Sequence, residues 1–573
     1  MFFRKQLIFG TLMLGLIGGG IQQVQAAETT GTVNTATSNS ISIDSWMPDK
    51  ALQTAVSQQL KITVDQLTPA KMADLTTLNI EREGITSLQG LQYATNLTKL
   101  LAGLNDISDL TPLAKLKNLT DLQLYGNDIT DLKPIKNLKK LTILNLASNE
   151  ITDIAPLKGL TKLQYLLLNN IRTTTIDLKQ LVQLSALSYL NLNNDAIKNS
   201  KLLGKLTKLT WLSLAGSDVK RITFLQTLTN LKLLDLTNNK ISDITAIKKL
   251  TKLTDLSLGL NQISNIKPLA KLTKLESLSL GINKITSVND LANLVKLQKL
   301  YLDVNNIHNI NKLKKLKNLR QLAIEQNALT DIAVLKNMPK LTELSASKQN
   351  VVLPIISIAK KQSLVQPLKI LNNQGTLVVP TLDTRITGAK YSVKNKQIMW
   401  GKLTKNGEVD SSWTSNITYG ANQTTNFSGT IVQPIQIRNS KQTLGVLKVY
   451  QAKNNTTSMA DKYVKKTVTI TKITNNKYRV LITLVSPQSM GKQPISLVKV
   501  ANSKAAPKLI SAGHKVGANY ETTYQLFLQK KNFNKPLPAN IHVEFTNPFK
   551  YKANYDIRLL IQNQSLGTNK KLK

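Results

Sequence analysis

The chain lacks cysteine altogether and has only three histidines among its 573 residues. Without cysteine no disulfide framework can form, so burial and backbone hydrogen bonds alone must hold the fold. His308, His514 and His542 stand far apart in the sequence, and no nucleophile elbow, metal-binding histidine pair or paired-carboxylate motif accompanies them. Single histidines of this kind are usually bystanders. The sequence therefore predicts that the protein is not an enzyme.

Acidic residues are also scarce, because 33 Asp and Glu stand against 75 Lys and Arg, and the formal net charge is +42. So large a surplus predicts attraction to polyanions. The export signal described next makes nucleic acid a poor partner. We therefore expect the anionic polymers of a bacterial cell wall, teichoic acids above all, and the alternative is that the charge serves solubility.

The apolar run at the N-terminus is too short for a membrane span. Arg4 and Lys5 precede an apolar stretch from Leu7 to Ile17, and Gly18-Gly19-Gly20 interrupts it well below the roughly 20 residues that a bilayer needs. Val24-Gln25-Ala26 then supplies a cleavage site. Residues 1–26 are predicted to be a cleaved secretory signal peptide, with no transmembrane span.

The C-terminal sequence NQSLGTNKKLK carries neither an apolar stop-transfer segment nor an LPxTG motif before one. Covalent attachment to the wall is therefore not expected. Together with the charge and the lack of cysteine, this predicts a secreted or cell-surface protein of a Gram-positive bacterium, associated with the wall non-covalently.

A repeat dominates the first two thirds of the chain. From Leu75 to Leu341 the pattern LxxLxLxxN recurs every 22 residues, except for a step of 24 between Leu163 and Leu187. A fixed period of this length predicts a leucine-rich-repeat solenoid over residues 75–350. Its leucines should point inward from short strands.

The ninth residue of each repeat is expected to turn its amide into the bend and satisfy backbone groups. This ladder asparagine recurs at Asn105, Asn127, Asn149, Asn239, Asn261, Asn283, Asn305 and Asn327. In the three middle repeats it is replaced by Ile171, Asp195 and Ser217. The irregular stretch coincides with the two-residue insertion.

The segments around the repeats complete this part of the chain. Residues 27–41 are expected to form a linker, and residues 42–74 a helical cap, which the exposed end of a solenoid requires. The 22-residue step, this cap, and the pairs Pro112-Leu113, Pro156-Leu157 and Pro268-Leu269 together resemble the internalin family of bacterial surface proteins. The resemblance implies an immunoglobulin-like domain next to the repeats, over residues 351–438, with Asn426 to Ile435 as its closing strand.

One face of the solenoid is expected to expose large side chains. Residues at the third position of each repeat point away from the core, because side chains alternate along a strand. In five consecutive repeats these residues are Ile143, Tyr165, Tyr189, Trp211 and Leu233, and Leu167 flanks them from the next column. With strands about 4.8 Å apart, the five would form a row roughly 19 Å long.

An exposed aromatic row of this kind usually marks a partner site. The alternative is that a loop or an adjacent domain covers it. The internalin resemblance implies that host proteins bind to this face, without fixing which one.

Beyond about residue 447, short alternating segments such as NNKYRVLITLV and YETTYQLFLQ are separated by turns. This pattern predicts a β-sandwich. Residues 439–565 resemble the NEAT (near iron transporter) domain, a haem-binding module of Gram-positive surface proteins, and residues 566–573 form a basic tail.

Two motifs carry the NEAT resemblance, S-x-x-x-x-Y at Ser458 to Tyr463 and Y-x-x-x-Y at Tyr551 and Tyr555. The resemblance implies that Tyr551 ligates ferric haem iron and that Tyr555 donates a hydrogen bond to the ligating oxygen. It also implies that Ser458 and Tyr463 hold a haem propionate while Met459 covers the distal side. Ferric iron favours an anionic oxygen ligand such as a phenolate, which fits these roles.

The alternative for the tyrosine pair is ordinary packing, since tyrosine is common in strands. Tyr520 and Tyr524 repeat the same spacing on an earlier strand. Two functions therefore remain open. The first is a wall-associated haem-binding protein for iron acquisition, which takes up free haem or haem passed from haem-carrying proteins, with the solenoid as an interaction surface. The second is an adhesin that binds a host or surface protein, with a NEAT-like domain that does not bind haem.

Overall fold

The computed structural model describes residues 42–562 apart from several short segments. The segments left out are 172–174, 384–385, 387, 421, 438–441, 452–466, 473–476, 488–494, 501–506, 517–518, 530–535 and 546–550. Among the residues described, no helix is long and apolar enough to cross a membrane.

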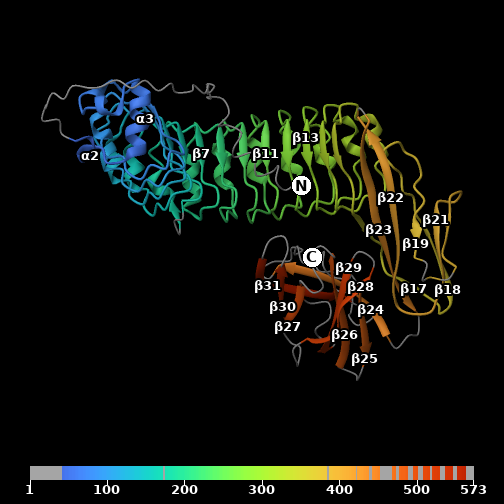
Figure 1. Cartoon of the computed structure of the whole chain (residues 1–573). Helices are drawn as coiled ribbons and strands as arrows, with labels where there is room; N and C mark the ends of the chain where they lie inside the picture. The colour runs from blue at the N-terminus through green and yellow to red at the C-terminus, as the bar shows by residue number, and fades with distance from the viewer. Residues whose placement is uncertain are drawn as a thin grey trace, which may run out of the picture.

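A small helical unit covers the first end of the solenoid (Figure 1). It consists of α2 (Ile43–Trp46), α3 (Lys50–Leu60), η3 (Val64–Gln66) and η4 (Lys71–Asp74). Asp49 caps α3 by accepting a hydrogen bond from the Leu52 amide at 3.0 Å, and its other oxygen accepts from the Thr86 amide at 2.8 Å. One carboxylate thus ties the helix to the first repeat.

The repeats form one parallel sheet of 13 strands (Figure 1). Its strands are β1 (Thr77–Asn79), β2 (Lys99–Leu101), β3 (Asp121–Gln123), β4 (Ile143–Asn145), β5 (Tyr165–Leu167), β7 (Tyr189–Asn191), β9 (Trp211–Ser213), β10 (Leu233–Asp235), β11 (Asp255–Ser257), β12 (Ser277–Ser279), β13 (Lys299–Tyr301), β14 (Gln321–Ala323) and β15 (Glu343–Ser345). Each strand pairs with the next in a register that matches equivalent repeat positions, for example Thr77 with Lys99. This confirms the predicted leucine-rich-repeat solenoid.

Short 3₁₀ helices return the chain from one strand to the next. They are η5 (Leu91–Tyr93), η6 (Thr111–Leu113), η7 (Lys133–Asn137), η8 (Ala155–Gly159), η9 (Leu178–Gln180), η10 (Ser200–Lys205), η11 (Thr223–Thr227), η12 (Thr245–Lys249), η13 (Lys267–Lys271), η14 (Asn289–Leu291), η15 (Asn311–Lys315) and η16 (Ala333–Asn337). Proline stands in the first turn of η6, η7, η8 and η13, where its missing N–H costs nothing. The repeat leucines between strands and helices are almost completely buried.

The asparagine ladder joins each repeat to the one before it. The Asn127 amide nitrogen donates to the Ala102 and Leu124 carbonyls, both at 3.0 Å, and its oxygen accepts from the Ile107 amide at 3.0 Å. Asn105, Asn149, Asn239, Asn261, Asn283, Asn305 and Asn327 make equivalent contacts. The predicted role of the asparagine is confirmed.

The ladder is interrupted in the three middle repeats. Ser217 donates to the Leu192 carbonyl at 2.8 Å, and Asp195 accepts from the Ile171 amide at 3.2 Å. The insertion in the same stretch makes room for a two-stranded parallel ribbon of β6 (Ile176–Asp177) and β8 (Ile197–Lys198). The irregularity of the sequence therefore appears as an irregularity of the fold.

The ladder continues one step past the last asparagine. Gln349 donates to the Ile324 and Ala346 carbonyls, both at 2.9 Å, and accepts from the Leu329 amide at 3.1 Å. Gln349 is also the first residue of β16, which pairs with a strand of the following segment. Gln349 thus belongs both to the ladder, through its side chain, and to the next sheet, through its backbone.

The segment after the solenoid contains two sheets. A sheet in the order β16-β23-β22-β19, with β17 on β23, lies beside a sheet in the order β18-β21-β20. The strands are β16 (Gln349–Val352), β17 (Ile356–Ile358), β18 (Gln362–Pro367), β19 (Thr381–Leu382), β20 (Lys390–Ser392), β21 (Gln397–Leu403), β22 (Gly407–Tyr419) and β23 (Gln423–Ile437). Trp400, Trp413 and Phe427 are buried here. The segment is strand-rich as expected, and its immunoglobulin-like character stays a prediction.

The C-terminal segment is an eight-stranded antiparallel sheet in the order β27-β30-β31-β24-β25-β26-β29-β28 (Figure 1). The strands are β24 (Gln442–Gln451), β25 (Thr467–Lys472), β26 (Lys477–Pro487), β27 (Ile495–Val500), β28 (Lys508–Val516), β29 (Asn519–Gln529), β30 (Pro536–Phe545) and β31 (Tyr551–Gln562). The strands expected from the alternating sequence are therefore present. The NEAT-type sandwich itself stays a prediction.

Candidate partner-binding face

The five large side chains expected to share one face of the solenoid do lie in one row. Register pairs Ile143 with Tyr165, Tyr165 with Tyr189, Tyr189 with Trp211 and Trp211 with Leu233. The middle residue of each of these strands is buried, so its neighbours point away from the core. We call these five residues the aromatic row, and the face that carries them the concave face.

The three rings of the aromatic row are stacked on one another. The Tyr189 and Trp211 ring centroids lie 3.9 Å apart with the planes only 8° from parallel. The Tyr165 and Tyr189 centroids lie 5.7 Å apart at 29°. Because Tyr189 has a ring on either side, both faces of its ring are covered.

Exposure differs along the row. Tyr165 is 41% exposed, whereas Tyr189, Trp211, Ile143 and Leu233 are half-buried. Burial raises the pKa of the Tyr189 phenol. This phenol therefore stays protonated at physiological pH and can donate a hydrogen bond.

A polar row lies directly beside the aromatic row, and the sequence interpretation missed most of it. At the fifth repeat position the register aligns Asn145, Leu167, Asn191, Ser213 and Asp235. Of these only Leu167 was predicted. Reading position five down the repeats, as was done for position three, would have found the others.

The polar row is held in place by its own strands. The Asn191 side-chain oxygen accepts from the Asn193 amide at 3.1 Å, and Asp235 accepts from the Thr237 amide at 2.9 Å. Burial raises the pKa of the Asp235 carboxyl, and the hydrogen bonds from Thr237 oppose that rise. Asn145, Asn191 and Ser213 are almost fully buried, so most of the polar row braces the strands beside the apolar strip rather than facing outward.

Charged and polar residues bound the aromatic row at both ends. Next to Ile143 stands Asp121, which forms an ion pair with Lys99 at 3.4 Å. Next to Leu233 stands Asp255. Such a strip, apolar at its centre and polar at its rim, has the anatomy of a protein interface.

The residues expected to hold haem are only partly described. Tyr551 and Tyr555 lie on β31, where the backbone pairs them with Phe545 and Ile541 of β30. Ser458, Met459 and Tyr463 lie outside the described residues. No haem pocket is therefore assembled from the residues that the structure describes.

Two further observations bear on the C-terminal tyrosines. Tyr524, the second residue of the other Y-x-x-x-Y pair, is 5% exposed, so at that position the spacing serves packing. Within the described part of the chain, no group of three or more His, Cys, Asp or Glu side chains could hold a metal ion.

Comparison with known proteins gives two family matches. The family described as Leucine Rich repeats (2 copies) matches residues 117–159, 207–249 and 251–293, and the family described as LRR adjacent matches residues 375–436. No curated protein sequence matches the chain. The family matches fall on the solenoid and on the strand-rich segment that follows it.

Several solved structures are similar to the chain. An internalin (inlF) from Listeria monocytogenes is 31% identical, with the match covering 54% of this chain and 98% of that one at a TM-score of 0.49. Internalin C2 of the same organism is 34% identical, covering 42% of this chain and 100% of that one at a TM-score of 0.34. A leucine-rich-repeat protein of Leptospira interrogans is 25% identical, covering 52% and 82% of the two chains at a TM-score of 0.43.

The strongest of these observations is sequence identity over almost the whole of two internalin structures. This chain also matches the leucine-rich-repeat family and, after the repeats, the LRR-adjacent family. On that identity, 31% and 34%, the chain belongs to the internalin-like leucine-rich-repeat proteins.

Proposed function

We propose that the protein is a secreted interaction protein whose concave face binds a protein of a host cell or of another surface. The observation that carries this proposal is the stacked, partly exposed aromatic row. Partner surfaces are enriched in Tyr and Trp because these rings bury much area with few rotatable bonds. The half-buried carboxylates of Asp121 and Asp255 at its two ends supply polar contacts for specificity.

A photo-crosslinking amino acid placed at Tyr165 of the full chain tests this proposal. Tyr165 is the most exposed residue of the row, so its replacement disturbs the fold least. On incubation with cultured host cells, we expect one predominant crosslinked protein from position 165. The same crosslinker at the exposed Lys271 is the control. Identical crosslinked products from both positions would contradict the proposal.

Ferric haem binding by the C-terminal sheet is a separate proposal. It is supported by the resemblance to the NEAT domain and by the place of Tyr551 and Tyr555 on β31, which forms the last strand pair with β30. In this proposal the phenolate of Tyr551 ligates the iron, and Tyr555 donates a hydrogen bond to the ligating oxygen. The absorption spectrum of the full chain mixed with haemin tests it, and a tyrosinate-type ferric spectrum is the expected result.

Association with the cell wall through charge is the third part of the proposal. The chain has 75 basic against 33 acidic residues, so an anionic wall polymer would hold it without a covalent link. Together these proposals describe a wall-held interaction protein with a haem-binding C-terminal segment. Each part can fail without the others.

A further inference from the structure

One edge of the solenoid carries a regular column of lysines. The residue immediately before the first leucine of a repeat is lysine in seven repeats, and each of these lysines is exposed. They are Lys140, Lys162, Lys208, Lys252, Lys274, Lys296 and Lys340. Because successive strands lie about 4.8 Å apart, the lysine column runs along the solenoid axis. A long anion lying on this edge would meet a cation in most repeats.

Asparagines in the same column hold some of these lysines. Where the preceding repeat has asparagine, the lysine ammonium donates to its side-chain oxygen, as in Lys252 to Asn230 at 2.7 Å and Lys340 to Asn318 at 2.8 Å. The Asn318 amide nitrogen in turn donates to the Val295 carbonyl at 3.0 Å. An amide oxygen orients the ammonium but leaves its charge uncompensated.

A recess opens on this edge near the end of the solenoid. Its volume is about 300 Å³, and it is lined by Glu276, Lys296, Gln298, Asn318, Arg320 and Lys340. Three cations thus face one carboxylate, and that carboxylate accepts a hydrogen bond from Gln298 at 3.3 Å. The recess has a net positive charge and several free donors.

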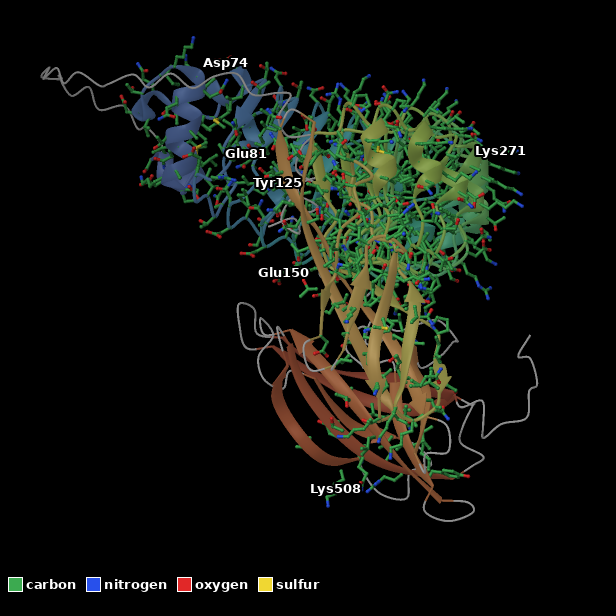
Figure 2. All side chains as sticks on the ribbon, turned by 90° about the vertical axis from the view of Figure 1, so that its right-hand side faces the viewer. Asp74, Glu81, Tyr125, Glu150, Lys271 and Lys508 are labelled. Atoms are coloured by element: carbon green, nitrogen blue, oxygen red, sulfur yellow. The ribbon has the colours of Figure 1, made fainter. Side chains whose placement is uncertain are left out.

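The cations of the recess have no acidic partner in the described part of the chain. Ion pairs such as Lys50 with Asp44, Lys99 with Asp121 and Lys240 with Asp218 lie outside the recess. The neighbouring 3₁₀ helices add more lysine than acid, with Lys312, Lys314 and Lys315 in η15. Figure 2 shows Lys271, at the end of η13, projecting from the outer edge of the solenoid.

From this arrangement we propose that the lysine column and the recess bind a linear polyanion whose backbone carries repeated phosphates. Arg320 offers a planar fork that matches a phosphate, while Lys296 and Lys340 act as point charges on either side of it. A single phosphate would gain from the recess alone. A chain of phosphates would also use the column, and each contact would release a counterion.

This inference rests on the wall association proposed above and assigns it to one surface. The expected ligand is a linear polymer rather than a lipid headgroup, because the column places a lysine at the same position of successive repeats along the solenoid axis. The concave face takes no part in it. Loss of protein binding there would leave this site untouched.

Long-chain inorganic polyphosphate is the probe. We expect the full chain to bind it in a salt-dependent way, and the triple variant Lys296→Gln, Arg320→Gln, Lys340→Gln to bind it about tenfold more weakly. Thermal unfolding of the variant should match that of the original protein, since all three side chains are on the surface. Inorganic monophosphate should compete poorly at equal phosphate concentration.

A matched variant distinguishes binding at this specific site from general attraction by the positive charge of the protein. Lys360→Gln, Lys361→Gln, Lys402→Gln removes three positive charges from exposed positions of the strand-rich segment that follows the solenoid. We expect it to weaken polyphosphate binding less than about twofold. Equal losses in the two triple variants would overturn the proposal, as would tighter binding to vesicles of anionic phospholipid than to polyphosphate. Wall retention is measured separately at low salt, so a protein that binds polyphosphate but is not retained on walls at low salt would refute only the wall association.

Discussion

Asp195 shows how one changed atom weakens a repeated contact. At the same position in other repeats an asparagine nitrogen donates to two carbonyls, as Asn149 does to Leu124 and Leu146. Asp195 has an oxygen in that place, and this Oδ2 atom is buried without a hydrogen-bond partner. Burial raises the pKa of its carboxyl from 3.8 to about 6. The group is therefore a buried charge above that pH.

Replacing Asp195 with asparagine should stabilise the protein in a pH-dependent way. A raised pKa in the folded state means that the protonated aspartate contributes stability below about pH 4, and that this contribution is lost as pH rises to about 6. Asp195→Asn keeps a donor at every pH. We expect its gain in the free energy of unfolding to be small at pH 4 and about 1–2 kcal/mol at pH 8.

Urea unfolding at the two pH values measures this difference. Asp128→Asn, which removes the same charge from an exposed position, is the control and should change stability little at either pH. An Asp195→Asn gain of equal size at pH 4 and pH 8 would show that the carboxyl is not protonated in the folded protein.

At the scale of elements, the aromatic stack stands in the same three repeats that lack the ladder asparagine. Tyr165, Tyr189 and Trp211 belong to the repeats in which Ile171, Asp195 and Ser217 replace it. Aromatic pairs contribute about 0.5–1.5 kcal/mol beyond their burial. The stack therefore supplies contacts between repeats where the hydrogen-bonded ladder is missing, and this role is separate from partner binding.

The two roles predict different effects along the row. Tyr165→Ala removes the exposed end of the stack and should lower the free energy of unfolding by less than about 1 kcal/mol while weakening partner binding. Trp211→Ser breaks the 3.9 Å stack and should cost about 1–3 kcal/mol. Urea unfolding and adhesion of the purified protein to host cells measure the two effects. Full adhesion by a folded Tyr165→Ala variant would place the partner elsewhere.

Substitutions of the two tyrosines of β31 should have different effects on haem binding. Tyr551→Ala deletes the proposed anionic ligand, so the protein should lose most of its ferric haem, whereas Tyr555→Phe should retain haem with a shifted redox potential or faster haem loss. Titration with haemin, followed by absorption, measures both. Tyr520→Ala, on β29, serves as the control. Equal haem binding with Tyr551 removed would eliminate the assignment.

The parts of the fold that repeat were predictable, because a 22-residue period fixes strand register and places Ile143, Tyr165, Tyr189, Trp211 and Leu233 in one row. The geometry within the row was not, since the period does not determine ring torsions or which ring is covered. The sequence pattern also did not predict that Gln349 would make the ladder contacts after the last asparagine, because a glutamine does not match LxxLxLxxN.

At the scale of the whole molecule, the net charge of +42 should govern retention on the wall. We expect a wash with 1 M salt to strip the protein from isolated walls, because the Debye length falls to about 3 Å. The fraction released can be measured by gel electrophoresis across a salt series, with a neutral osmolyte of equal osmolarity as the control. Retention through the wash would instead require a specific, uncharged receptor.

The interrupted asparagine ladder also has a mechanical consequence. Intact ladder contacts end at Asn149 and resume at Asn239, so a pull along the solenoid meets its weakest joint between them. A molecule bound to the wall through the recess in the last repeats and to a host cell through the aromatic row would carry such tension under fluid flow. Because the aromatic row spans this joint, stretching would separate the rings and disrupt the partner site. The lifetime of the bond to the host would therefore decrease as the shear increased.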